Sequence, residues 1–248
     1  MPGTSTVLMA CPARFRFDVV GMQPAIVFIT GTDTGVGKTL LTALLVRFLR
    51  GHGVPAAALK PVCSGGRSDA RLLRVASGGR LTLDEINPWH FRAPVAPVLA
   101  ARRERKRVKR SAVVAHIRRL QNRFDVLLIE GAGGALSPLG DDFNSRDLIA
   151  SLRALPMVVC PNRLGAVNQI LLTLAALPPG AATRAHVVLM SPPKPDVATR
   201  TNAGLLAEHF DEERVFQLPW LGGQIDWDRA SQELRVKRTL CALVRFIF

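Results

Sequence analysis

A glycine-rich segment that runs into a lysine and a threonine carries the clearest chemistry in this sequence. It reads Gly31-Thr-Asp-Thr-Gly-Val-Gly-Lys-Thr39 and lies between an apolar run, 26–30, and an amphipathic stretch that begins at Lys38. Glycines let backbone N–H groups face phosphate oxygens, and the N-terminus of the following helix adds partial positive charge. Lys38 would neutralise the β and γ oxygens, and the hydroxyl of Thr39 would bind Mg²⁺. Although Gly31 and Gly37 enclose one residue more than the common pattern, the segment predicts a nucleoside triphosphate site.

Charged residues also end two other apolar runs. Lys60 follows the run 56–59 and precedes a Ser/Gly loop, so we expect it to point into the same crevice as a compact positive charge. Glu130 ends the run 126–130 before Gly131-Ala-Gly-Gly134, where it could hold Mg²⁺ or activate a water. Asp69 opens a helical stretch and is either a helix cap or a third polar group of the site. The alternatives for Lys60 and Glu130 are an edge lysine and a surface acid.

Short apolar runs alternate along the chain with amphipathic stretches. The runs do not alternate in polarity, which is typical of strands buried on both faces. The predicted strands are 25–30, 56–60, 126–130, 157–160, 187–190 and 215–218, and the predicted helices are 38–50, 70–76, 111–121, 145–152, 166–177 and 201–209. This order predicts an α/β fold of the P-loop NTPase type, with a mostly parallel sheet and helices on both faces. Ligands bind at the carboxyl ends of such strands, where the loops above lie.

Length and composition favour one globular domain. The chain has 248 residues, 48% of them hydrophobic, which excludes wholesale disorder. We expect a single domain over 22–248, with residues 1–21 as a disordered leader or a misassigned start. No apolar run reaches the ~18 residues of a membrane span, and we expect a cytoplasmic protein. The four cysteines lie far apart, so we expect free thiols and no zinc site.

The net charge of +14 is typical of proteins that bind nucleic acid or an anionic surface. The densest basic run, 102–110, is interpreted as a solvated loop and helix start, with a phosphate-backbone patch or an anionic protein partner as alternatives. No aromatic residue is interleaved to stack on bases, so we expect no nucleic acid.

Together these segments resemble dethiobiotin synthetases. The similarity rests on the nine-residue loop 31–39, on Lys60-Pro-Val-Cys-Ser-Gly65, on Glu130-Gly-Ala-Gly-Gly134 and on Pro219-Trp-Leu221, and it covers roughly residues 25–221. The resemblance implies a ligase that uses ATP and Mg²⁺ to close a cyclic urea in biotin synthesis. Its substrates would be 7,8-diaminopelargonate and CO₂, which form a carbamate that the γ-phosphate activates as a mixed anhydride. The second amine then expels phosphate.

The resemblance also implies a role for individual residues. Lys38, Lys60 and Thr34 would serve catalysis, and Thr39, Asp69 and Glu130 would hold the metal. Ser64 would position the substrate, whose carboxylate would lie on the helix start Gly165, Ala166, Val167 and Asn168 of a partner subunit, which implies a homodimer. The nucleotide would contact Gly35, Val36, Gly37, Lys38, Thr39, Glu130, Gly131, Gly133, Gly134 and Pro219.

Two departures from the family pattern concern specificity. Met190-Ser191 stands where the family usually carries an Asn-Asp pair that contacts adenine, and the chain has no tyrosine to place near the substrate carboxylate.

The alternatives to a dethiobiotin synthetase are a partition-type ATPase, a cobyrinic acid diamide synthase and a family member without catalytic activity. Asp33 stands where the partition-type loop has a second lysine, and only 27 residues follow Leu221, too few for an amidotransferase domain.

Overall fold

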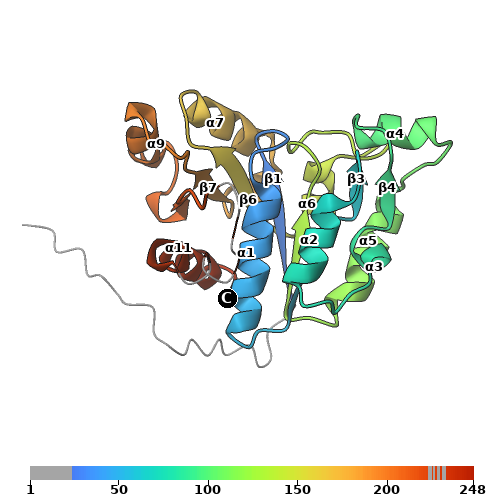
Figure 1. Ribbon diagram of the computed structural model, residues 1–248. Helices are drawn as coiled ribbons and strands as arrows, with labels where there is room; N and C mark the ends of the chain where they lie inside the picture. Colours follow the sequence, from blue (N-terminus) through green and yellow to red (C-terminus); the bar gives the residue numbers. More distant parts are fainter. Residues whose placement is uncertain (1–23, 223–224, 226, 228–229, 231–232) are drawn as a thin grey trace, which may run out of the picture.

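Six parallel strands form the central sheet of the protein. The computed structural model describes residues 24–222, 225, 227, 230 and 233–248 (Figure 1). The strand order is β2-β5-β1-β6-β7-β8, and every pairing is parallel. The strands are β1 (Ala25–Gly31), β2 (Ala56–Leu59), β5 (Val126–Glu130), β6 (Leu155–Pro161), β7 (His186–Met190) and β8 (Val215–Leu218). The predicted α/β class is therefore confirmed.

Helices cover both faces of this sheet. On one face α1 (Lys38–Gly51) packs with α2 (Ser68–Ala76) and α11 (Leu234–Arg245), and on the other α5 (Arg110–Gln121) packs with α6 (Ser145–Leu152) (Figure 1). The helices α7 (Ala166–Ala176) and α9 (Val197–Ala207) follow β6 and β7. Both sides are covered because the strands are almost entirely apolar and buried, β5 over its whole length.

Several short elements were not predicted. A second sheet pairs β3 (Val62–Ser64) with β4 (Trp89–Phe91), and the short helices are α3 (Leu83–Ile86), α4 (Pro97–Arg103), α8 (Pro179–Ala182) and the 3₁₀ turn η1 (Glu212–Arg214). Strands of three residues are too short to show a period. The predicted helix 201–209 is shifted, because the capping box of Asp196 starts α9 at Val197.

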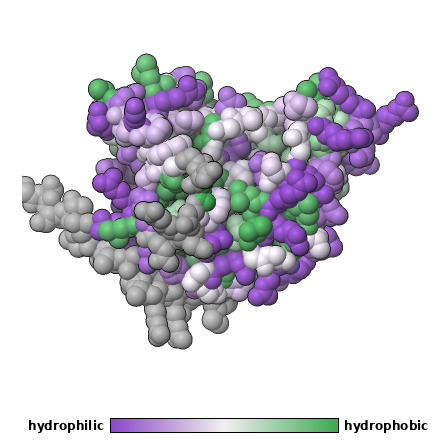
Figure 2. All heavy atoms as spheres, viewed as in Figure 1, coloured by the Kyte–Doolittle hydropathy of each residue, from purple (hydrophilic) through white to green (hydrophobic). Residues whose placement is uncertain are grey.

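The basic run 102–110 connects two helices, as expected for a solvated loop and helix start. α4 ends at Arg103 and α5 begins at Arg110. Asp141 pairs with Arg102 at 2.5 Å and with Arg107 at 3.4 Å. Hydrophilic residues gather over this end of the molecule, on the α4 side of the view in Figure 2.

Expectations about cysteines, the terminus and membranes have different outcomes. Cys63 and Cys160 are free thiols. Cys241 is disulfide-bonded, so the expectation of free thiols is wrong there, because spacing along a sequence says nothing about proximity in the fold. Residues 1–21, expected to be a disordered leader or a misassigned start, lie outside the described residues. Within the described part of the chain, no helix is long and apolar enough to cross a membrane.

Candidate active site

The glycine-rich loop leaves β1 and turns directly into α1. Gly35 and Gly37 have φ angles of 72° and 101°, a region that L side chains rarely adopt. Gly37 caps α1, and its carbonyl accepts the first helical bond from Leu41 N at 3.0 Å. A Cβ at Gly31 would lie 2.6 Å from the side chain of the buried Val36. Glycines and one apolar anchor thus shape a loop that opens toward a ligand at the helix N-terminus.

Lys38 lies beneath this loop at the start of α1. The residue is only 6% exposed, and its Nζ donates to the carbonyl oxygen of Asp33 at 2.6 Å. Burial lowers the pKa of Lys38 to about 8, with Lys60 adding to the shift and Glu130 opposing it. The side chain of Lys38 therefore bonds to a neutral carbonyl within the loop, and no carboxylate among the described residues pairs with its charge by direct contact.

The ends of β2 and β5 and the start of α1 bring together Lys60, Glu130 and Thr39. The register pairs Ile29 with Glu130 and Leu59 with Ile129, so Lys60 emerges beside Glu130 next to the glycine-rich loop. Lys60 Nζ donates to Glu130 Oε1 at 2.8 Å, and Thr39 Oγ1 donates to the same oxygen at 2.7 Å.

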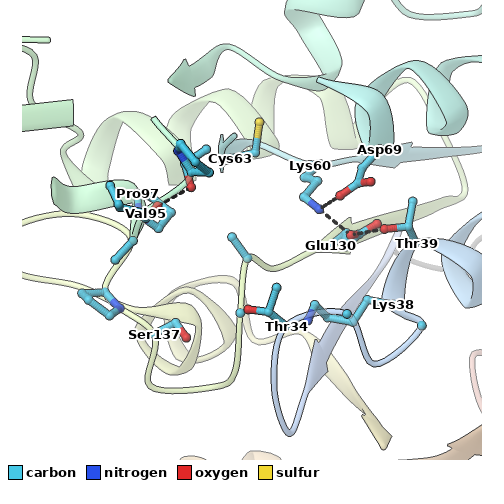
Figure 3. Close-up of a pocket in the computed structure, with 18 of the residues that line it drawn as sticks. Thr34, Lys38, Thr39, Lys60, Cys63, Asp69, Val95, Pro97, Glu130 and Ser137 are labelled. Carbon is cyan, nitrogen blue, oxygen red and sulfur yellow. Dashed lines mark hydrogen bonds and ion pairs between the residues drawn. The ribbon is translucent and has the colours of Figure 1, made fainter. Parts of the chain in front are cut away.

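Asp69, from the first turn of α2, completes this cluster by pairing with the other side of Lys60 (Figure 3). Arg67 precedes α2 at its N-cap position, and no side chain caps this helix. The alternative interpretation of Asp69 as a mere helix cap therefore does not describe its contacts.

Burial and charge act against each other in this cluster. Burial lowers the pKa of Lys60, but the charges and hydrogen bonds of Glu130 and Asp69 more than offset it, so the pKa is raised. Burial raises the pKa of Glu130, although Lys60 and the Thr39 hydroxyl oppose the rise. The pair is buried but hydrogen-bonded, which is the condition under which two charges remain stable inside a protein.

The same cluster fits a magnesium ion. Glu130 Oε2 is buried and has no hydrogen-bond partner among the described residues, an arrangement that calls for a ligand. The Thr39 hydroxyl and the Asp69 carboxylate complete an all-oxygen donor set close to it. Among the described residues no group of three or more His, Cys, Asp or Glu side chains could hold a metal by itself. Mg²⁺ needs no such cage, because one or two carboxylates together with substrate phosphates suffice.

A cavity of about 720 Å³ lies over these residues (Figure 3). Its lining contains the predicted Thr34, Gly35, Gly37, Lys38, Thr39, Lys60, Ser64, Asp69, Glu130 and Gly133. Residues missed from the sequence also line it, namely Leu40, Cys63, Pro94, Val95, Ala96, Pro97, Ala132, Ser137 and Pro138. The cavity therefore joins a charged phosphate end to a wall of small apolar residues.

Two hydroxyl groups shape that wall. Ser64 Oγ donates to the carbonyl oxygen of Val95 at 2.5 Å and so ties the segment before α4 to the end of β3. Ser137 Oγ accepts from Gly134 N at 2.9 Å and holds the glycine turn after Glu130. Ser137 lies three residues after the pair Gly133-Gly134, and this spacing was the sequence signal that could have predicted its role in the turn.

The sequence relationships of the chain agree with this geometry. A family model described as an AAA domain matches residues 26–227. The "ATP-dependent dethiobiotin synthetase BioD" of Anaeromyxobacter dehalogenans is 41% identical over 198 residues, which cover 78% of this chain and 89% of that protein. The protein of the same name from Bacillus velezensis is 32% identical, covering 83% and 88%. The chain belongs to the dethiobiotin synthetase family.

Solved structures confirm the fold class. The partition protein in "Structure of pNOB8 ParA bound to nonspecific DNA" has a TM-score of 0.56 at 12% identity and covers 90% of this chain and 98% of its own. The signal recognition particle receptor FtsY of Elizabethkingia anophelis has a TM-score of 0.51 at 14% identity, covering 92% and 66%. At these identities the likeness concerns the fold alone.

Some residues singled out by resemblance to dethiobiotin synthetases lie apart from the cavity. Gly165 caps α7 with a φ of 88°, but neither it nor Ala166, Val167 or Asn168 lines the cavity. Pro219 does not line it either, and Val36, Gly131 and Gly134 take part only through backbone and packing around the loops. A Cβ at Gly131 would lie 2.8 Å from Ser145 Oγ, so this glycine allows close packing beneath Glu130.

Proposed function

We propose that this chain closes the cyclic urea of dethiobiotin from 7,8-diaminopelargonate and CO₂ at the expense of ATP. Membership in the dethiobiotin synthetase family supports this reaction. The main structural support for placing it in the catalytic cavity is that Lys38 and Lys60 both line that cavity. A carbamate and a γ-phosphate are both anions, so bringing them into contact requires concentrated positive charge.

The reaction divides into three bond-forming steps. One amine of the substrate adds to CO₂ and loses a proton, which gives the carbamate. A carbamate oxygen then attacks the γ-phosphorus while the bond to ADP breaks. Finally the second amine attacks the carbamate carbon, the bond to phosphate breaks, and the amine releases its proton.

Residues of the chain would hold these groups as follows. The N–H groups of the glycine-rich loop and Lys38 contact the phosphates, and Lys60 faces the carbamate and the transferred phosphoryl group. Thr39, Asp69 and Glu130 would hold Mg²⁺, which supplies neutralisation of the phosphate charge. Thr34 and Ser64 line the cavity and would orient the diamine.

The tail of the substrate would extend to a partner subunit. Its carboxylate would lie on the start of α7, residues 165–168, where helix N–H groups attract anions. Leu164, just before α7, and Leu172, within it, are 85% and 63% exposed, which supports a homodimer that covers them. Pro219 would contact the nucleotide base, and the use of ATP favours the cytoplasm.

Product formation tests this function directly. Purified protein receives 7,8-diaminopelargonate, bicarbonate and Mg²⁺ with ATP, GTP or CTP in parallel, and mass spectrometry detects dethiobiotin. Product with any nucleotide supports the reaction, and the pattern reports the effect of Met190 and Ser191 on base choice. Nucleotide binding without product in every tube would contradict it and favour a member without this catalytic activity.

A further inference from the structure

A second cavity lies at the opposite edge of the central sheet. It has a volume of about 680 Å³ and opens at the amino ends of β1, β6 and β7, near the C-terminus marked in Figure 1. The residues that line it share no member with the catalytic cavity. A ligand here would therefore not contact the groups proposed for urea closure.

Four arginines from four different parts of the fold line this cavity, and no Asp or Glu among the described residues lines it. They are Arg118 of α5, Arg153 after α6, Arg184 before β7 and Arg214 of η1. Arg118 donates to Gln121 Oε1 at 2.7 Å and to the Leu152 carbonyl at 2.9 Å, and Arg184 donates to the Gly180 carbonyl at 3.1 Å. These acceptors orient the guanidinium groups without neutralising them.

Asp211, outside the lining, offsets one of the four charges by pairing with Arg214 at 3.1 Å. The remaining three, Arg118, Arg153 and Arg184, are exposed and pair with no carboxylate of the described residues, so the mouth of the cavity is positively charged and attracts an anion.

Arg153 is held at the cavity rim in an unusual backbone conformation. It ends α6 with a φ of 52°, in the left-handed region where glycine or asparagine is favoured. The side chain is exposed, and no hydrogen bond or ion pair of it is found with any described residue. An arginine that lines a cavity from a position that disfavours it, and that has no protein partner there, points to a ligand contact.

The inner wall of the cavity combines a buried imidazole with apolar surface. His186 is 3% exposed, and neither of its ring nitrogens has a hydrogen-bond partner among the described residues. The ring lies 4.6 Å from that of Phe246, and Leu155 and Ile247 line the cavity beside it. The buried ring and its neighbours make this wall of the cavity largely apolar.

We propose that this cavity binds an organic anion with a carboxylate or phosphate head on an apolar chain. The arginines take the head, because their planar groups match both carboxylate and phosphate geometry. The apolar wall takes the chain. The site is independent of the proposed reaction.

Calorimetry on the full-length protein with octanoate and octyl phosphate tests the proposal. At least one of them binds with a stoichiometry of one per chain, and the tighter of the two identifies the head group. Octanol, which lacks the charge, and acetate, which lacks the chain, bind at least tenfold more weakly. Equal binding of acetate, or no binding of either tailed anion, overturns the proposal.

Substitutions locate the binding. Arg153→Asn removes the guanidinium while asparagine accepts the left-handed backbone, and it weakens binding by about tenfold. Arg105→Asn is the matched control, because Arg105 is exposed, has a φ of 54° and lies outside the cavity. A second variant, Arg184→Gln, gives a loss of similar size. Binding that survives both cavity variants assigns the anion elsewhere and refutes the site.

Discussion

Replacing Lys60 by alanine tests the charged cluster in both stability and turnover. Lys60 Nζ lies 2.8 Å from Glu130 Oε1, and the two residues are 7% and 1% exposed. At an effective dielectric constant of about 20 this contact corresponds to an attraction of about 6 kcal/mol, against a desolvation cost of several kcal/mol. Removing one partner leaves a buried carboxylate without its cation. We therefore expect the free energy of unfolding to fall by about 3 kcal/mol at pH 8.

The loss depends on pH in a direction set by Glu130. Burial raises the pKa of this carboxyl group, and without Lys60 it rises further. In the folded variant Glu130 binds a proton as pH falls through this raised pKa, whereas in the unfolded chain it binds one only near 4.5. The penalty is therefore fully present above the raised pKa and smaller at pH 5. Urea unfolding at both pH values measures it.

A double-mutant cycle with Glu130→Gln isolates the contact itself. The neutral amide no longer needs a cation, so Lys60→Ala should cost less when it is combined with Glu130→Gln, with a coupling of at least 1 kcal/mol. Turnover of Lys60→Ala should fall by about 10² or more while nucleotide binding stays measurable. A loss below 0.5 kcal/mol at both pH values with no coupling, or near-normal turnover, would refute the proposed arrangement and role.

Three further predictions concern the loop and its support. ATP affinity should weaken as pH rises through about 8, because the buried Lys38 loses its proton, and Lys38→Met should flatten that profile in calorimetric titrations from pH 6.5 to 9.5. Gly37→Ala should weaken ATP binding at least tenfold, since φ is 101° and the new Cβ would lie 2.9 Å from Met190 Cε; an unchanged dissociation constant would contradict this. Asn87→Ala removes the 2.6 Å bond from Nδ2 to the Lys60 carbonyl, so kcat should fall about tenfold with KM for ATP little changed. An unchanged kcat per folded molecule, with the folded fraction measured by ATP-binding stoichiometry, would contradict this role.

Sequence patterns predicted the parts of the fold that have a strong period. The strands 126–130 and 215–218 and the helix 145–152 have the predicted bounds, because each is a compact apolar or amphipathic run with clear ends. The helix α11 was missed although its buried Val236, Leu240 and Val244 repeat every four residues. That signal was present and could have been used.

Some residues of the site could be predicted from the sequence and others could not. Residues at strand ends were predictable, because parallel strands deliver their carboxyl ends to one edge of the sheet. The apolar wall at Val95 and Pro97 was not, since it depends on the small β3–β4 sheet and on the bond from Ser64 to Val95. The contacts of the fully buried Asn87 with Lys60 and Cys63 were not predicted either, because they are long-range.

The two lysines of the cavity differ in what their charges contact, and this difference assigns them different tasks. Lys38 donates to a neutral carbonyl, so its charge is open to an arriving polyanion. Lys60 is paired with two carboxylates, and its charge becomes available only when Asp69 and Glu130 engage another cation. A change at Lys38 should therefore reduce nucleotide affinity first. A change at Lys60 should instead reduce turnover, because its charge is needed after the nucleotide is bound, when a second anion must approach the γ-phosphate.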